Sequence, residues 1–207
     1  MTAATRPRRL RSDAQRNHQV ILETARDLFA ATGSQVEIKE IARQAGVGVG
    51  TVCRHFPTKD ELIGAVLAEM QQDILDQVRA ALTEPDAGAA FRGTLEALTD
   101  LPSRNRLFAE LIADGRKHLA DPELIGQFHA AIDDLMRRAQ DAGAIRRDVG
   151  PADIAMLLAG IMQAASMADE LDADQRGRYL AIVWDGLRPL EPTPLPGKPR
   201  QMNRSAS

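Results

Sequence analysis

The sequence is poor in cysteine and in aromatic residues, and each shortage excludes a class of protein. One cysteine among 207 residues excludes an internal disulfide framework and a metal site built from clustered cysteines. Aromatic residues make up 3% of the chain, so a core must consist mainly of Leu, Ile, Ala, Val and Met. That mixture favours helices over sheets.

Long apolar runs are also missing. No stretch approaches the roughly 20 apolar residues that a membrane-spanning helix needs, and the basic N-terminus lacks the apolar core of a signal peptide. We therefore expect a cytoplasmic protein without a membrane partner. The length suits one sizeable domain, or a small domain fused to a larger one.

Charge is unevenly distributed along the chain. Residues 1–60 contain ten Lys and Arg against six Asp and Glu, a balance of +4, and the remainder has a balance of −7. A basic segment joined to an acidic body indicates that the first part meets a polyanion. The alternative is that both blocks are simply solvated surface.

Helical spacing of apolar residues runs through the chain and strand signals are absent, so the fold class is predicted to be all-α. We expect three short helices at the N-terminus and five or six longer ones behind them. The predicted division is a disordered basic arm (1–11), a small domain of short helices (12–57), a larger helical domain (58–190) and a Pro-rich disordered tail (191–207).

Several helix starts are marked by capping residues. Ser12 and Gln15 fit a capping box for the first helix, and Thr58 and Glu61 fit another that opens a long helix. Asp121 followed by Pro122 predicts a helix with an Asp cap and Pro at its first position.

The stretch "AGVGVGTVCRHFPTKDEL", residues 45–62, at first sight suggests a glycine-rich phosphate loop. A P-loop, however, needs Lys where Thr51 stands. A dinucleotide-binding fingerprint needs a strand before its glycines, and a helical pattern precedes them here. A nucleotide loop is therefore disfavoured.

A catalytic site in the same stretch is disfavoured as well. Cys53 and His55 lie two residues apart, so on a helix they face away from each other. His18, His118 and His129 have no spacing typical of a metal site. We expect no catalytic residue, no metal and no cofactor.

A helix-turn-helix accounts for more of these residues. That motif needs a small residue in its first helix, a glycine in its turn and an apolar residue facing back from its second helix. Ala42, Gly46 and Val52 supply this series. Gly46 is expected to adopt a positive φ, and Gly48 is a permissive N-cap.

The segments "RNHQVILETARDLFAATG" and "IKEIARQAGVGVGTVCRHFPTKDELIGAVL" resemble the DNA-binding domain of the TetR/AcrR family of bacterial transcriptional regulators. The resemblance covers about Arg16 to Leu67, and the rest of the chain matches only as a variable helical body. It implies a homodimeric repressor that binds a palindromic, double-stranded DNA operator and is released by a small-molecule effector. An activator, or a helical ligand-binding or interaction module that has lost DNA binding, remains the alternative.

Three positions depart from the family pattern. Cys53 stands where the family mostly has an aromatic residue that lies against the DNA backbone. Glu37 stands where a capping Thr is common, and Gly48 where Ser is common. Fewer backbone contacts to DNA are expected. Cys53 is either a small replacement for Tyr or a redox sensor, because neighbouring Arg54 and His55 favour a thiolate.

The exposed side of the third helix is expected to read the bases. Val49 can meet a thymine methyl group, and Arg54 can bind a guanine or instead clamp a phosphate. The resemblance places Thr51, His55 and Lys59 at the sugar-phosphate backbone, although His55 also suits a structural role. The full set expected to bind DNA is Arg43, Gln44, Val49, Thr51, Cys53, Arg54, His55 and Lys59. The arginines of residues 6–11 either follow the minor groove or are solvated.

The helices behind the motif are expected to hold an effector and a second subunit. The predicted pocket residues are Phe91, Leu95, Phe108, Leu111, Phe128, Ile132 and Met136, with Leu98 beside them and His118, His129 and Asp114 as candidate polar groups. The predicted dimer interface comprises Ile154, Leu157, Leu158, Ile161, Tyr179, Ile182, Val183 and Leu187. In both sets the alternative is that the residues form ordinary intrachain core. A ligand-dependent tilt would pass through the long helix that starts at Thr58.

Overall fold

The computed structural model describes residues 6–114, 121–167, 173–190 and 193–199, and within these ranges every regular element is a helix. This confirms the all-α prediction. The helices are α1 (Arg6–Thr32), the short 3-10 helix η1 (Gly33–Gln35), α2 (Ile38–Gln44), α3 (Val49–His55), α4 (Lys59–Ala81), α5 (Ala87–Arg104), α6 (Arg106–Asp114), α7 (Pro122–Asp141), α8 (Pro151–Met167) and α9 (Ala173–Leu187).

The chain has two hydrophobic cores, which meet within α4. The first core joins α1, α2 and α3 to the N-terminal half of α4 as far as Met70. The second begins at Leu75 and includes residues of α5, α7, α8 and α9. We call residues 6–70 the head and residues 71–199 the body. The cores therefore divide about one turn beyond Met70, whereas the sequence placed the domain boundary before Thr58.

The beginning of α1 differs from the expectation of a disordered arm. The backbone is helical from Arg6, so residues 6–11 belong to α1 and Ser12 lies inside the helix instead of capping it. Pro7 is compatible with this start, because the first turn of a helix needs no intrahelical N–H donor. The predicted basic character of this segment is unchanged, but the side chains of residues 6–12 lie outside the described part of the chain.

The other two capping predictions are confirmed. The hydroxyl of Thr58 accepts a hydrogen bond from the Glu61 amide at 3.1 Å, which caps α4. The carboxylate of Asp121 accepts from the amide of Glu123 at 2.8 Å, and α7 starts at Pro122. Each cap satisfies an amide that the first turn of a helix leaves without a partner.

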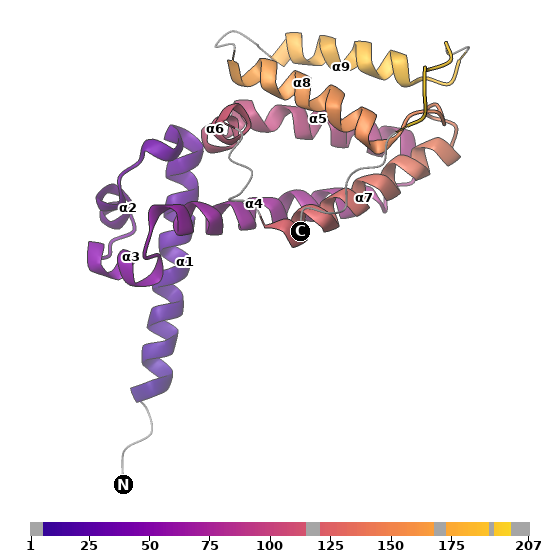
Figure 1. The fold of residues 1–207 in the computed structure, drawn as a ribbon. Helices are drawn as coiled ribbons and strands as arrows, with labels where there is room; N and C mark the ends of the chain where they lie inside the picture. Colours follow the sequence, from indigo (N-terminus) through magenta and orange to yellow (C-terminus); the bar gives the residue numbers. More distant parts are fainter. Residues whose placement is uncertain (1–5, 115–120, 168–172, 191–192, 200–207) are drawn as a thin grey trace.

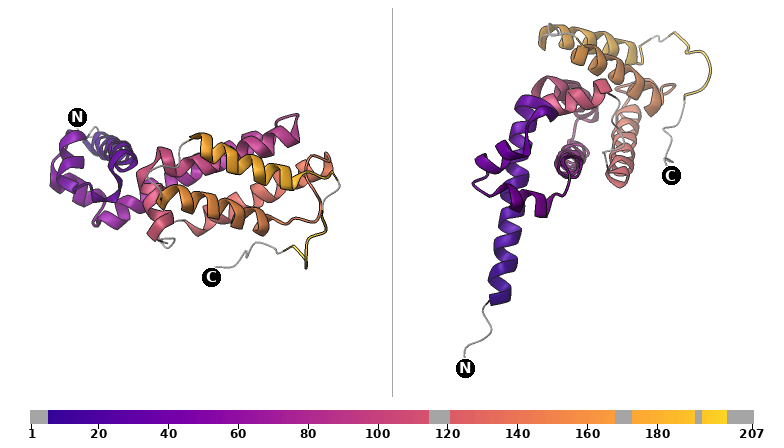
Figure 2. Two further views of the ribbon diagram at one scale, coloured as in Figure 1. Left: turned by 90° about the horizontal axis from the view of Figure 1, so that it is seen from above. Right: turned by 60° about the vertical axis from the view of Figure 1, so that its left-hand side comes forward.

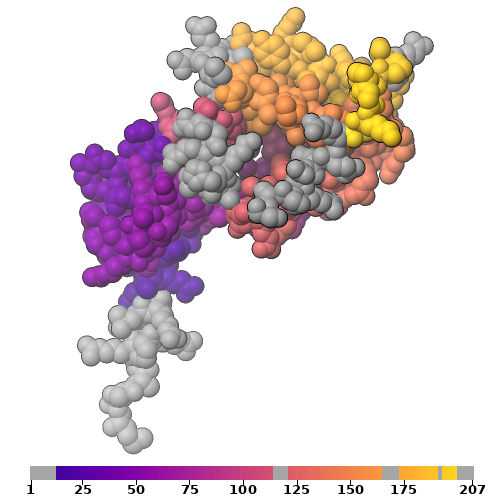
Figure 3. Space-filling view, viewed as in Figure 1, coloured from indigo at the N-terminus to yellow at the C-terminus, as the bar shows by residue number. Residues whose placement is uncertain are grey.

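The helices are arranged so that α4 connects head and body (Figure 1). It leaves the head and runs along α7, while α5 and α6 lie between this pair and the outer helices α8 and α9 (Figure 2). α8 and α9 form the upper surface of the body in the space-filling view (Figure 3). No helix in the described ranges is long and apolar enough to cross a membrane.

A buried arginine fixes the far end of α9. The guanidinium of Arg146, 7% exposed, binds the carboxylate of Asp148 at 2.6 and 2.7 Å and donates to the carbonyl of Thr193 at 2.6 Å. The Arg146 amide donates to the carbonyl of Leu187 at 2.8 Å. These bonds attach the loop between α7 and α8 to the end of α9 and so fix the position of α9 in the body.

Candidate DNA-binding surface and ligand pocket

The turn between α2 and α3 has the geometry expected of a helix-turn-helix. Ala42 and Val52 are fully buried where the two helices cross, and the Val47 amide donates to the Ala42 carbonyl at 3.0 Å. Gly46 has φ +68°, and a Cβ there would meet no atom within 4 Å. Its backbone conformation, and not a lack of space, therefore favours glycine at this position.

α3 presents one side to solvent and the other to the head core. Val49, Cys53 and Arg54 are exposed, whereas Val52 is buried between them. Gly48 is the N-cap in an extended conformation without a side-chain bond. The Arg54 guanidinium has no ion pair or hydrogen bond with any described residue, so its donors and charge face outward.

The phosphate-contact candidates lie at the edge of this surface. Thr51, His55 and Lys59 are half-buried. The ring of His55 lies edge-on to His18 of α1, with centroids 5.5 Å apart, and His18 in turn stacks on Phe56 at 4.8 Å. His55 therefore has a packing contact with α1 in addition to its partly exposed edge.

Arg43 and Gln44 are both engaged by one carboxylate. Arg43 donates two hydrogen bonds to Glu40, at 2.6 and 2.9 Å, and Gln44 donates a third at 2.9 Å. The bonds from Arg43 and Gln44 hold the pKa of Glu40 down at about 2. Glu40 is thus ionised at neutral pH, and its charge compensates that of Arg43.

The start of α2 shows the same local compensation. Glu37 occupies the N-cap position but makes no side-chain capping bond, as expected for a residue that caps less well than Thr. Its carboxylate instead pairs with Lys39 at 2.6 Å. The charges of Lys39 and Arg43 are thus compensated locally, whereas Arg54 has no ion pair with any described residue.

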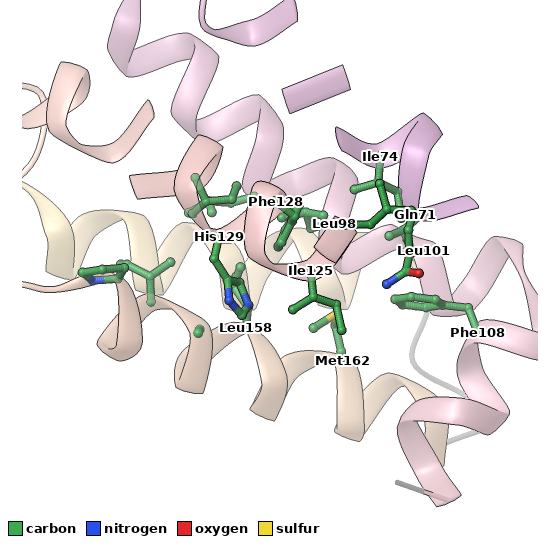
Figure 4. Close-up of a pocket in the computed structure, with 16 residues that line it drawn as sticks. Gln71, Ile74, Leu98, Leu101, Phe108, Ile125, Phe128, His129, Leu158 and Met162 are labelled. Atoms are coloured by element: carbon green, nitrogen blue, oxygen red, sulfur yellow. The ribbon is translucent and has the colours of Figure 1, made fainter. Parts of the chain in front are cut away.

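The body contains a cavity of about 260 Å³. It lies among α4, α5, α6, α7 and α8 (Figure 4). The residues that line it are Gln71, Ile74, Leu95, Leu98, Leu101, Phe108, Leu124, Ile125, Phe128, His129, Ile132, Pro151, Ile154, Ala155, Leu158 and Met162.

Four of the predicted pocket residues, Leu95, Phe108, Phe128 and Ile132, line this cavity, and so do neighbouring Leu98 and His129. The other three do not. Phe91 and Met136 point into the body core, and Leu111 packs against the head core. Helical spacing identifies a buried face, but it does not tell which buried side chains border empty space.

Some cavity residues were not predicted as pocket residues. Gln71 and Ile74 come from the connecting helix α4, and Leu124 and Ile125 from the first turns of α7. Ile74 was recognisable as part of the apolar side of α4, but nothing in the sequence marked Gln71. His118 and the side chain of Asp114 lie outside the described part of the chain.

The predicted dimer residues divide into two groups. Leu157, Tyr179 and Ile182 are exposed on α8 and α9, and so is Met156, which is 74% exposed and was not predicted as an interface residue. Ile154, Leu158 and Leu187 are instead buried in the body core, and the first two line the cavity. Ile161 is buried as well, and Val183 packs partly against the body core. Ile154, Leu158 and Leu187 are therefore core residues of the single chain, which helical spacing did not separate from the exposed interface candidates.

Family comparisons match both parts of the chain. Residues 21–66 match the model described as bacterial regulatory proteins, tetR family. Residues 86–189 match the model described as transcriptional regulator SbtR-like, C-terminal domain. Residues 67–85, which include most of α4, lie between the two matches.

Individual proteins agree with these matches. A TetR transcription regulatory protein of Mycobacterium vanbaalenii is 35% identical, with a TM-score of 0.64, and the alignment covers 86% of this chain and 99% of that one. The HTH-type transcriptional repressor Rv3405c of Mycobacterium tuberculosis is 30% identical, over 83% of this chain and 89% of its own. The transcriptional regulator FadR of Bacillus subtilis, solved in complex with stearoyl-CoA, is 16% identical with a TM-score of 0.62, over 83% of this chain and 100% of its own; this likeness concerns the fold.

The fold and the helix-turn-helix define a DNA-binding transcriptional regulator. The chain belongs to the TetR family of bacterial regulators.

Proposed function

We propose that this regulator is a repressor that binds a palindromic operator as a homodimer and leaves it when a small molecule occupies the cavity of the body. The observation that carries the proposal is the outward face of α3, where Arg54 is exposed without a partner among the described residues. The name of Rv3405c as a repressor and the ligand complex of FadR are consistent with this function. Its place of action is the cytoplasm, and it involves no enzymatic step.

The head is the DNA-binding part in this proposal. Val49 and Arg54 contact base edges, because a recognition helix reads the major groove with its exposed side. Thr51, His55 and Lys59 contact the sugar-phosphate backbone and set the register of the complex.

Arg43, Gln44 and Cys53 complete the proposed DNA-facing set with smaller contributions. The bonds of Arg43 and Gln44 to Glu40 must be broken or shared before either side chain can donate to DNA. Cys53 is exposed beside Arg54, but its side chain is shorter than an aromatic ring and covers less of the DNA backbone.

The body joins the two subunits. A palindromic site needs two heads held about one DNA turn apart, or a multiple of it. The side chains of Met156, Leu157, Tyr179 and Ile182 are exposed on α8 and α9, the two helices that form the upper, outer face of the body (Figure 3). Pairing this face with its copy across a two-fold axis gives a four-helix interface and removes these side chains from water.

Release requires that the effector favour a spacing of the heads that does not fit the operator. α4 supplies one physical link, since it belongs to both cores. α6 supplies a second link, because Leu107 is buried in the head core while its neighbour Phe108 both packs against that core and lines the cavity.

DNA binding by the full-length protein to its own upstream region tests the proposal. Gel shifts over a salt series, with a footprint, are expected to give a specific protected site of two half-sites and a steep loss of affinity with salt. Unrelated DNA of equal length is the control. Weak binding of equal strength to both DNAs would contradict the regulator and favour a module that has lost DNA binding.

A further inference from the structure

The cavity is almost entirely apolar. Of the sixteen described residues that line it, fourteen are aliphatic, aromatic, Pro or Met, and the remaining two are Gln71 and His129. No Lys, Arg, Asp or Glu is among the described residues that line it. A charged group buried in such surroundings loses its hydration and gains no counter-charge from the described lining residues, which is strongly unfavourable.

The volume sets the size of the occupant. An apolar cavity of about 150 Å³ in another protein holds one benzene molecule. The present cavity measures about 260 Å³. It therefore has room for more than a single six-membered ring, for example for two fused rings.

Gln71 offers one defined hydrogen-bond donor. Its side-chain oxygen accepts from the backbone amide of Asp121 at 3.0 Å, which orients the amide group. No described residue accepts a hydrogen bond from its nitrogen, Nε2. Gln71 lies next to Leu101 and Phe108 at one end of the cavity (Figure 4).

His129 offers a second polar group some distance away. In the view of Figure 4, Ile125 lies between the His129 ring and Gln71. Partial burial lowers the pKa of His129 below its usual value, so the ring is neutral at neutral pH. A neutral imidazole has one N–H donor and one nitrogen acceptor.

We propose that the effector is an uncharged, mostly apolar molecule larger than a single ring, whose polar group accepts a hydrogen bond from Gln71. His129 selects among such molecules by a second hydrogen bond where the molecule reaches it. The inference rests on the proposed role of the cavity as the effector site, but direct binding tests it without DNA.

The chemical class is tested by isothermal titration calorimetry of the full-length protein at pH 7.4 with four probes: 2-naphthol, 2-naphthoate, naphthalene and phenol. We expect 2-naphthol to bind at least about tenfold more tightly than the anionic 2-naphthoate, because the carboxylate must be buried unpaired. Naphthalene lacks the hydroxyl, and phenol lacks the second ring, so both should bind more weakly than 2-naphthol.

The donor is tested with a matched pair of glutamines on α4. Gln71→Met keeps a similar side-chain volume and removes Nε2. The affinity for 2-naphthol should fall by about fivefold, which corresponds to one hydrogen bond, and the affinity for naphthalene should stay almost unchanged. Gln72→Met is the control, because Gln72 does not line the cavity and bonds to Asp76 instead.

The location is tested with a matched pair of alanines. Ala155→Leu fills part of the cavity and should lower the affinity for 2-naphthol by about tenfold or more. Ala130→Leu adds the same atoms at an exposed position of α7 and should not. Thermal melts verify that each variant is folded.

Tighter binding of 2-naphthoate than of 2-naphthol would overturn the proposal, as would no saturable binding of 2-naphthol to the folded protein. Equal weakening by Gln71→Met and Gln72→Met would exclude the donor role. Since the operator footprint is measured separately, a specific footprint combined with failed probe binding would reject the effector class and retain the regulator. Binding of 2-naphthol without any footprint would support the effector class and reject the regulator.

Discussion

The cations near the turn differ in how much of their charge reaches the surface. Lys39 is paired with Glu37 at 2.6 Å, and Arg43 is held by Glu40, whereas Arg54 has no partner among the described residues. Arg43 and Arg54 carry the same side chain, so residue type does not separate them. Their neighbours make Arg54 the strongest candidate for base recognition.

Replacing Arg54 by Ala should therefore weaken specific operator binding more than non-specific binding. The expected loss for the operator is about 1–3 kcal/mol, the value of a bidentate contact to guanine. Gel-shift titrations with operator and with scrambled DNA, at one salt concentration, measure both losses.

Arg43→Ala is the matched control, and its effect should be smaller because Glu40 already compensates the charge of Arg43. Equal losses on operator and scrambled DNA after Arg54→Ala would show that Arg54 only clamps a phosphate.

Among the helices, α6 makes the least expected connection. Its Glu110 carboxylate accepts the backbone N–H of Ser34, with a separation of 2.7 Å, at the turn after α1. Gly33 in that turn has φ +77°, and a Cβ there would clash with Glu110 Oε1. The carboxylate therefore occupies the space that a glycine leaves open, and it ties α6 to the head.

Removing this carboxylate should cost stability. Glu110→Ala is expected to lower the free energy of unfolding by about 1 kcal/mol or more, since a charge-assisted hydrogen bond is lost and the Ser34 amide remains partly buried. Glu96→Ala is the matched control, because the exposed ion pair of Glu96 with Arg92 contributes little. Urea unfolding at a fixed protein concentration measures both variants.

The same contact predicts coupling between two substitutions. Gly33→Ala should cost less stability in the Glu110→Ala background than in the wild type, because the clash with the carboxylate is then absent, although the strain of a positive φ remains. The expected coupling is about 0.5–3 kcal/mol. Strictly additive effects would contradict the contact.

For the whole molecule, the proposed assembly depends on the outer face of α8 and α9. Ile182 is 60% exposed in the single chain, and the proposed dimer buries it. Ile182→Asp places an unpaired charge in that interface and should raise the dimer dissociation constant by about a hundredfold or more.

Sedimentation at micromolar protein concentration measures this change, and operator binding should fall with it. Leu190→Asp is the control, because Leu190 is 80% exposed and lies beyond the end of α9. If Ile182→Asp remained a dimer as tight as the wild type, the subunits would have to pair through another surface.

The amino-acid sequence by itself determined the helical class, the helix-turn-helix and the family. These depend on local patterns: the spacing of Ala42, Gly46 and Val52, and the capping residues Thr58 and Asp121. Such signals act within a few residues of each other, so they can be read without a fold.

Only the tertiary structure decided which apolar residues face the cavity, the core or the solvent. Helical spacing placed Leu157 and Leu158 in one predicted interface, but Leu157 is exposed to solvent and Leu158 lines the cavity. Likewise, no local pattern pairs Glu110 with Ser34, which lie 76 residues apart. The physical reason is that periodicity reports how apolar a helix face is, whereas the packing of whole helices determines what that face meets.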